Sequence, residues 1–427
     1  MSTAIEINEE ATYRKVTWRL MPLLLVCYIV AYLDRVNVGF AKLQMMNALG
    51  FSDVVYGLGA GIFFVGYFLF EVPSNVILHK VGARLWIGRI MISWGILSAG
   101  MLFVTNDTAF YVMRFLLGIA EAGFFPGIIL YLTYWYPSHR RGRITALFMT
   151  GIALSGVIGG PLSGYIMKIF DGTHGMAGWQ WMFLLEGLPA VLLGVIVIIM
   201  LDDRIAQAKW LTEEERALLA KNIAAEEEEK HDAPISTVLT SPRVWLMALI
   251  YFSYVMGLYG VSFWLPTIIK GMGIADPLEI GLMSAIPYGA AVVVMLLISK
   301  SADRLRERRW HVALPGIFGA IGLLLSVFWA HDTVLAMAAL TLATAGIITT
   351  LPLFWSLPTA FLTGTGAAAG IAMINSVGNL AGFTSPYLVG WLKQLTGSTD
   401  AGMYMLAGSL IFAAILTISV PARLVNK

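Results

Sequence analysis

The chain has 427 residues, of which 58% are hydrophobic and only 13% are charged. Soluble domains carry roughly 25% charged residues, so this composition, with a mean hydropathy of +0.77, excludes an ordinary soluble protein. The net charge is only +2, and the basic residues are dispersed between apolar runs. No basic patch indicates a nucleic-acid partner. The single cysteine, Cys27, excludes an internal disulfide, and we expect neither a metal site nor a cofactor.

Residues 1–17 are polar and lack the pattern of a signal peptide, so the first apolar run is itself expected to cross the membrane. About 20 apolar residues span the hydrocarbon core, and by this rule we expect an all-α membrane protein with twelve transmembrane helices. The first six are expected at residues 18–41, 54–78, 86–105, 108–136, 144–169 and 179–201. The second six are expected at residues 243–269, 277–300, 311–330, 333–362, 366–394 and 400–421.

The chain is expected to form two six-helix bundles, residues 1–201 and residues 243–427. They are joined by the polar segment 202–242, in which we expect a short soluble helix from Thr212 to Glu229. The two halves echo each other at an offset of 224–225 residues. Parallel six-helix repeats that flank a site at mid-membrane depth are a common arrangement of transporters.

The basic residues predict which side each loop occupies. Of the 28 lysines and arginines, 22 fall on one side of the twelve expected spans, and four fall on the other. Those four are Lys42, Lys168, Lys270 and Lys393. Because lysine and arginine are enriched in cytoplasmic loops, both termini and the central segment are expected in the cytoplasm.

Two short stretches place an acid and an arginine inside apolar spans: Asp34 with Arg35, and Arg114 with Glu121. An ionisable group at that depth costs about 2.5–3.5 kcal/mol on insertion scales and is kept mainly where it has a function. Arg114 and Glu121 are seven residues apart, so they share one helix face at a spacing of about 10 Å. Asp34 and Arg35 point about 100° apart, so both can reach the interior only at its edge.

Together these four groups are neutral, so an added carboxylate would make them negative and a proton would restore neutrality. The constellation therefore predicts a site that binds an organic anion together with a proton. We expect Arg35 to bind the carboxylate, Asp34 and Glu121 to carry protons, and Arg114 to act as the pairing charge. The alternative is a static buried ion-pair network that only holds helices together.

Uncharged side chains in the spans are candidates for the walls of the pocket. They are Tyr32, Tyr67, Trp355, Ser356, Asn375 and Asn379. For the aromatic members, core packing or a place in the interfacial belt is an equal alternative. Glu71, before Val72 and Pro73, could gate, bend or simply pack its helix, and Glu186 is expected to be structural. A stripe of glycines in the fifth span is expected to allow close helix packing: Gly151, Gly156, Gly159, Gly160 and Gly164.

Nearly the whole chain resembles the major facilitator superfamily, and within it the anion:cation symporter family, most closely its bacterial tartrate-type transporters. The motifs that carry the resemblance are Tyr32–Asn37, Phe70–Asn75, Arg114–Gly127 and Gly178–Phe183. The resemblance implies import of a small organic anion by proton symport through alternating access. The cargo implied is a carboxylate such as tartrate or a sugar acid, or else an aromatic carboxylate such as phthalate or hydroxyphenylacetate.

The resemblance also implies individual roles. The family's proton-linked acids fall on Asp34 and Glu121, its substrate-binding arginine on Arg35 and a pocket asparagine on Asn379. It implies a monomer in the bacterial inner membrane. One departure is the loop after the second span, where Asn75–Arg84 lacks the acid of the superfamily motif.

Two other functions compete with import. A proton-coupled exporter of an amphipathic compound would not need Arg35. An enzyme or a receptor is disfavoured, because the spans hold no nucleophile–base pair or metal-ligand cluster and the one sizeable polar segment is short.

Overall fold

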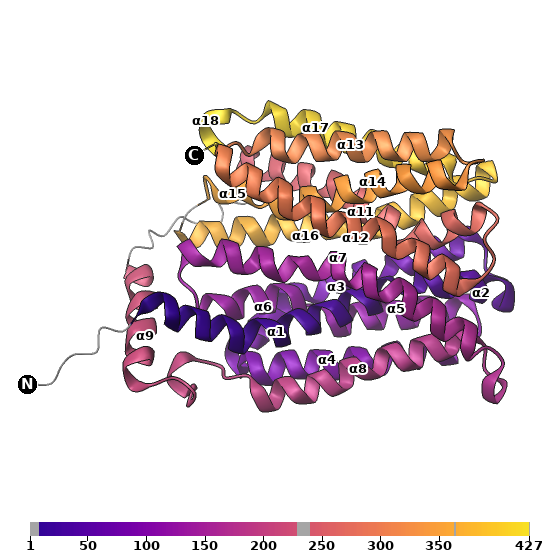
Figure 1. The fold of residues 1–427 in the computed structure, drawn as a ribbon. Coiled ribbons are helices and arrows are strands. Elements are labelled where there is room, and N and C mark those ends of the chain that lie inside the picture. The colour runs from indigo at the N-terminus through magenta and orange to yellow at the C-terminus, as the bar shows by residue number, and fades with distance from the viewer. Residues whose placement is uncertain (1–7, 229–239, 363, 427) are drawn as a thin grey trace, which may run out of the picture.

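The computed structural model describes residues 8–228, 240–362 and 364–426, and over these the fold is all-helical (Figure 1). The first half contains α1 (Glu9–Val36), α2 (Val38–Leu49), α3 (Asp53–Val81), α4 (Ala83–Gly100), η1 (Met101–Phe103), α5 (Asp107–Glu121), α6 (Phe124–Thr133), α7 (Ser138–Ile169), η2 (Thr173–Gly175) and α8 (Gly178–Met200). Between the halves lie η3 (Ile205–Gln207) and α9 (Glu213–Glu228). The second half contains α11 (Pro242–Gly271), α12 (Pro277–Leu305), α13 (Arg309–Phe328), α14 (Thr333–Phe354), α15 (Ser356–Thr359), α16 (Gly364–Thr396), α17 (Asp400–Ser419) and α18 (Ala422–Val425).

The helices form twelve membrane-crossing units, as predicted. Among the described residues, 11 helical segments are long and apolar enough to span a bilayer, and α16 is the twelfth. Helices dominate because a backbone in lipid must satisfy its own hydrogen bonds. The first helix begins at Glu9, well before the predicted residue 18, because Asn8 caps it by accepting a hydrogen bond from the Ala11 amide.

Three predicted spans are interrupted, the first of them at Asn37, between α1 and α2. The fourth, predicted as one helix, ends as α5 at Glu121 and resumes as α6 at Phe124. Gly123 makes the break with a φ of 86°, and a Cβ there would lie 2.3 Å from the Ser74 Oγ. A glycine is therefore required at this position. The tenth span is divided at Trp355, between α14 and α15, where the backbone keeps right-handed helical angles.

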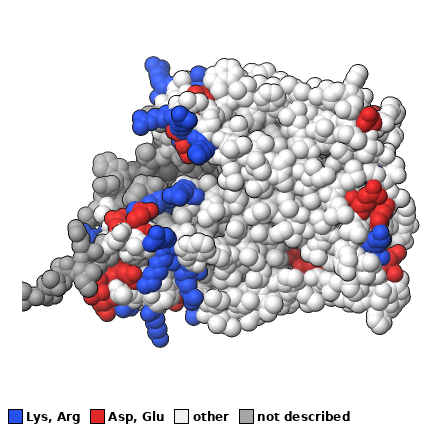
Figure 2. Space-filling view, in the orientation of Figure 1, with Lys and Arg blue, Asp and Glu red and all other residues white. Residues whose placement is uncertain are grey.

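The helices run side by side from one end of the molecule to the other, with α1–α8 in one half and α11–α17 in the other (Figure 1). Most charged side chains in this view gather at the two ends, and a band that is almost free of charge lies between them (Figure 2). Large apolar side chains in this band are exposed, for example Leu192 at 63% and Leu297 at 63%. Such a belt is suited to contact with lipid.

The two ends differ in their basic residues. We call the end that carries Lys80, Arg140 and Arg309 the basic end, and the opposite end the sparse end; Figure 2 shows most of the blue side chains at the former. The predicted soluble helix is present as α9 and lies at the basic end. There Lys15 pairs with Glu215 at 2.7 Å.

The halves meet closely toward the sparse end. Helix α7 packs on α12 there, and a Cβ added to Gly160 would lie 2.7 Å from the carbonyl oxygen of Gly281. The predicted close approach along the glycine stripe is confirmed at this crossing. Gly156 and Gly164 likewise face α12, against Tyr288 and Pro277, whereas Gly151 faces Tyr28 of its own half.

Candidate functional site

Arg35 lies near the end of α1 and is 5% exposed. Its Nε donates to Glu121 Oε1 at 3.1 Å, and its Nη2 forms a closer ion pair with the same oxygen. Its Nη1 donates to the Tyr259 hydroxyl at 2.9 Å, and Tyr259 belongs to α11 of the other half. One guanidinium thus joins a carboxylate of the first half to a phenol of the second.

Aromatic rings fill the space around this ion pair. The guanidinium carbon lies 5.3–5.9 Å from the ring centroids of four residues: Tyr32, Phe63, Phe64 and Tyr67. A cation above a ring face is attracted by the ring quadrupole. Together the four rings form a box around Arg35, which we call the Arg35 box. The rings also exclude water, so charge interactions inside the Arg35 box are stronger than at a surface. The predicted pocket residues Tyr32 and Tyr67 are therefore beside Arg35.

Glu121 is the last residue of α5, directly before the break that Gly123 makes. It is fully buried, and among the described residues its Oε2 has no hydrogen-bond partner. Because one oxygen is held by Arg35 and the other is free, this carboxylate can accept a proton without losing a hydrogen bond. Placing such groups at helix breaks is typical of transporter sites.

Arg114 does not pair with Glu121 as we expected. Its guanidinium donates to backbone oxygens, those of Gly59 at 3.2 Å, Ala60 at 3.2 Å and Arg35 at 3.4 Å. The prediction was wrong because helical spacing fixes only that Arg114 and Glu121 share a face. The nearer partner of Glu121 comes from another helix, and Arg114 instead ties α5 to α3 and α1.

Asp34 faces away from Arg35, into the first half. Its carboxylate accepts from Trp94 Nε1 at 2.9 Å and from Ser98 Oγ at 3.2 Å, both on α4. The four predicted ionisable groups are all buried. They do not form one cluster, however, because only Arg35 and Glu121 face the other half.

Glu71 forms a second polar link between the halves. This α3 side chain accepts from Asn375 Nδ2 at 3.0 Å and from Ser376 Oγ at 3.2 Å, both on α16. Asn379, one turn further along, also lies near the carboxylate. The gating alternative for Glu71 thus has a structural basis, and the predicted residues Asn375 and Asn379 belong to this link rather than to the Arg35 box.

Two predicted site residues lie further from Arg35. The Trp355 ring contacts the Tyr251 ring at 4.9 Å, and the Ser356 hydroxyl donates to the carbonyl of Leu353 in the preceding turn. Trp355 therefore supports Tyr251, and Ser356 satisfies a carbonyl at the helix break. In this conformation the Ser356 hydroxyl donates to the backbone of its own span.

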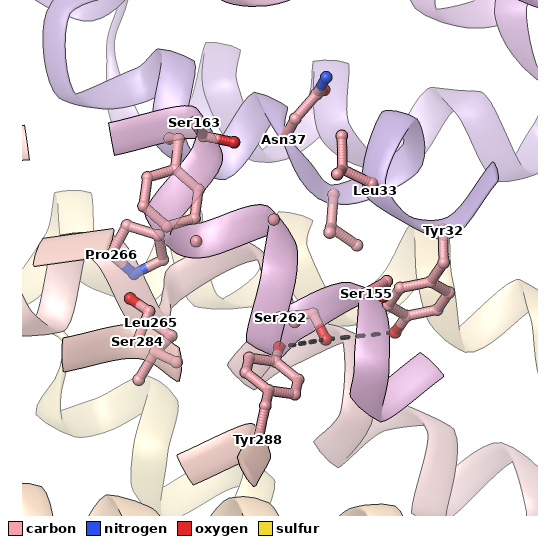
Figure 3. Close-up of a pocket in the computed structure, with 15 residues that line it drawn as sticks. Tyr32, Leu33, Asn37, Ser155, Ser163, Ser262, Leu265, Pro266, Ser284 and Tyr288 are labelled. Carbon is pink, nitrogen blue, oxygen red and sulfur yellow. Dashed lines mark hydrogen bonds between the residues drawn. The ribbon is translucent and has the colours of Figure 1, made fainter. Parts of the chain in front are cut away.

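A small pocket lies between the halves and shares Tyr32 with the surroundings of Arg35; Figure 3 shows the residues that line it. Its hydroxyl groups come from α1, α7, α11 and α12, and they are Tyr32, Ser155, Ser163, Ser262, Ser284 and Tyr288. Its amide group is Asn37, between α1 and α2. Figure 3 shows the Ser262 hydroxyl between those of Tyr32 and Tyr288, at 3.3 and 3.2 Å. Glu186 stands behind this wall, where it accepts from Asn37 and Ser163 at 2.9 and 2.7 Å.

Sequence reasoning missed Tyr259, Ser262 and Tyr288. A signal for Tyr259 was present, because it lies 224 residues after Arg35, the offset at which the halves echo each other. A pseudo-twofold repeat brings equivalent positions of α1 and α11 to opposite sides of the same centre. Ser262 and Tyr288 carried no such signal, since serine and tyrosine are ordinary residues of a packed span.

Sequence comparison recognises most of this architecture. The Major Facilitator Superfamily profile matches residues 24–386. The chain belongs to the major facilitator superfamily.

Three bacterial relatives align along almost their full length. The chain is 51% identical to the candidate metabolite transport protein NicT of Pseudomonas putida, over 99% of this chain and 97% of that protein. It is 52% identical to a candidate tartrate transporter of Agrobacterium vitis, over 96% and 91%. It is 44% identical to a quinolone resistance transporter of Acinetobacter baumannii, over 97% and 96%.

Among solved structures, the fold is similar to that of the xylose transporter XylE from E. coli in a partially occluded inward-open conformation. The TM-score is 0.73 with 14% identity, over 94% of this chain and 98% of that one. At this identity the similarity concerns the fold alone.

Proposed function

We propose that the protein imports a small organic anion, a carboxylate such as tartrate or a sugar acid, together with protons. The observation that carries the proposal is the buried Arg35–Glu121 ion pair, which faces the other half through Tyr259. An arginine is the side chain best shaped to bind a carboxylate through two parallel hydrogen bonds. The relatives named for tartrate transport support a carboxylate cargo.

The proposed coupling is a competition for one guanidinium. An incoming carboxylate takes the Arg35 donors that Glu121 now uses. A buried carboxylate left without its cation costs several kcal/mol, so Glu121 takes up a proton when the substrate arrives. Substrate and proton therefore stabilise each other's binding, as symport requires.

Asp34 is proposed as the second proton carrier. Its acceptors are used by the neutral donors Trp94 and Ser98, and no cation pairs with it among the described residues. Two acids that can each hold one proton suit a dianion such as tartrate, because two protons then restore neutrality.

The pocket in Figure 3 favours a hydroxylated acid over an aromatic one. Its serine and tyrosine hydroxyls can hydrogen-bond the hydroxyl groups of tartrate or of a sugar acid. The ring of an aromatic carboxylate offers these hydroxyls no donor or acceptor, so such a cargo would gain fewer hydrogen bonds in this pocket.

The proposal also includes the orientation of the protein in the membrane and the roles of its two bundles. The lysine- and arginine-rich loops support a cytoplasmic location, in a bacterium, for the basic end and both termini. Residues 1–201 and 243–427 are the two bundles that rock about the site, the segment 202–242 joins them, and a single chain contains the complete pathway.

A second candidate function is the proton-coupled export of an amphipathic compound. The relative named for quinolone resistance favours it. Export would require outward flux and would not depend on Arg35. Full transport activity in an Arg35→Ala variant would decide for this alternative.

The test of import uses purified protein in liposomes with a pH gradient and radiolabelled tartrate or D-gluconate. Wild type should accumulate the acid against its gradient. Glu121→Gln should abolish accumulation and retain substrate exchange, since the neutral side chain still fits but carries no removable proton. Asp34→Asn tests the second carrier in the same way. Accumulation that is unchanged in both variants would exclude the proposed carriers.

A further inference from the structure

Three of the four lysines of the sparse end bind an acceptor that belongs to the other half. Lys168 of α7 pairs with Asp276 at the start of α12, at 2.6 Å. Lys270 of α11 donates to the carbonyl of Leu43 in α2, at 3.0 Å. Lys42 and Lys393, the other two, meet on a single carboxylate.

That carboxylate belongs to Asp53, the first residue of α3. Lys42 Nζ lies 2.8 Å from its Oδ1, and Lys393 Nζ lies 2.9 and 2.8 Å from its two oxygens. Lys42 comes from the first half and Lys393 from the second. The Trp264 ring closes the arrangement, 3.6 Å from Lys42 Nζ.

The cluster contains two ammonium groups and one carboxylate, so it carries an excess of one positive charge. The Lys42 side chain is 3% exposed, and its Nζ, although close to Asp53, has no acceptor in hydrogen-bond geometry among the described residues. Lys393 is partly exposed at 23%. The cluster thus has more donors than its one internal acid can use.

We propose that Asp53 occupies a carboxylate-binding site that the substrate anion takes over when the halves part at the sparse end. Lys393, with Trp264 beside it, is then the first capture point for an organic anion on its way to Arg35. This inference rests on the proposed function, since it requires an anionic cargo that arrives from this end.

Anion capture by Lys393 follows from which half each residue of the cluster belongs to. When the halves part, Asp53 stays with Lys42 on the first half, and Lys393 loses its acceptor on the second. An ammonium group that faces a narrow, low-dielectric mouth raises the local concentration of anions and speeds their arrival. Such steering weakens steeply as the ionic strength rises.

The experiment compares two variants that break the same ion pair from opposite sides. Uptake of radiolabelled tartrate is measured in proteoliposomes at low and high ionic strength. Lys393→Gln should raise the KM roughly threefold to tenfold at low salt and should lose most of the salt dependence. Asp53→Asn frees the same lysine, so its KM should equal or fall below that of wild type.

A lysine that served only to hold the halves together would give the same change in both variants, and that result overturns the proposal. A KM and a salt dependence of Lys393→Gln that match those of wild type would also overturn the proposal. Lys80→Gln removes an exposed charge at the basic end and is the matched control, with no change expected in KM. If wild type takes up no carboxylate at all, the proposed function fails together with this inference.

The opening itself can be followed without transport. The chain has one cysteine, so Cys27→Ala gives a cysteine-free background for spin labels at exposed Thr105 and His331, one in each half. Both Lys393→Gln and Asp53→Asn should widen the distance distribution, because each removes the link. Distances that do not change in either variant would exclude Asp53 as the occupant that must be displaced.

Discussion

At the scale of single residues, Arg35 is the point on which the site depends. Its guanidinium already has one acceptor from each half, Glu121 and Tyr259. In the proposed mechanism, a substrate carboxylate therefore displaces one of these two partners rather than filling an empty place. This explains how one buried cation can sense both the cargo and the approach of the second half.

Arg35→Lys keeps the charge and removes the planar fork. Lysine offers a point charge and cannot bind a carboxylate through two parallel hydrogen bonds. We expect substrate affinity to fall at least about tenfold, which corresponds to about 1.4 kcal/mol. Calorimetric titration of purified protein with tartrate measures this, and an unchanged affinity would remove Arg35 from the binding site.

Tyr259→Phe deletes the hydroxyl that Arg35 Nη1 uses. A hydrogen bond to a charged group contributes about 1.5–3 kcal/mol, so the closed arrangement should be weakened and the maximal transport rate should fall about tenfold. Tyr254→Phe is the control, because that hydroxyl contacts Thr417 within the second half. Equal effects of the two variants would contradict a special role for Tyr259.

The sequence revealed the charged residues of the site and not their partners. Asp34, Arg35, Arg114 and Glu121 stand out because charge is rare in apolar spans. Which of them pair depends on how α1, α4 and α5 are packed, and no helical spacing contains that information. Arg114 was therefore assigned to Glu121 when in fact it donates to backbone oxygens.

At the scale of helices, contacts between the halves take two forms. Glycines bring α7 against α12, and Glu71 joins α3 to α16 through Asn375 and Ser376. The α7–α12 contact depends on the small volume of its glycines, and the α3–α16 contact depends on the charge of Glu71. A larger side chain should therefore disrupt the α7–α12 contact, and neutralising Glu71 should weaken the α3–α16 contact.

Gly160→Leu should keep the sparse end from closing. Even a Cβ at this position lies 2.7 Å from the Gly281 carbonyl oxygen, which is backbone and cannot move aside cheaply. We expect transport to be lost while binding from the sparse end persists. Gly289→Ala on α12 is the control, because a Cβ there meets nothing within 4 Å. Normal transport by Gly160→Leu would show that this crossing does not close.

Glu71→Gln should loosen α16 from α3. Hydrogen bonds to a charged acceptor are roughly twice as strong as neutral ones, so amide hydrogen exchange across residues 374–380 should be faster than in wild type. Glu186→Gln is the matched control, because its partners Asn37 and Ser163 lie in the same half. Equal exchange in Glu71→Gln and wild type would mean that the link does not hold the halves.

At the scale of the whole molecule, hydropathy alone predicted the twelve spans and their order. It could not predict the breaks at Gly123 and Trp355, because an apolar run reads the same whether its backbone is continuous or interrupted. Nor could it show that three of the four lysines of the sparse end bind an acceptor in the other half, although it placed all four on one side. The number of such residues was predictable from the sequence, and their contacts required the fold.

In the proposed mechanism, carboxylate binding at Arg35 makes Glu121 take up a proton. Calorimetric titration of purified protein with tartrate at one pH, in two buffers of different ionisation enthalpy, measures that proton directly. Wild type should take up protons on binding, and Glu121→Gln should take up fewer. Binding of tartrate with no proton uptake by wild type would contradict the coupling on which the account depends.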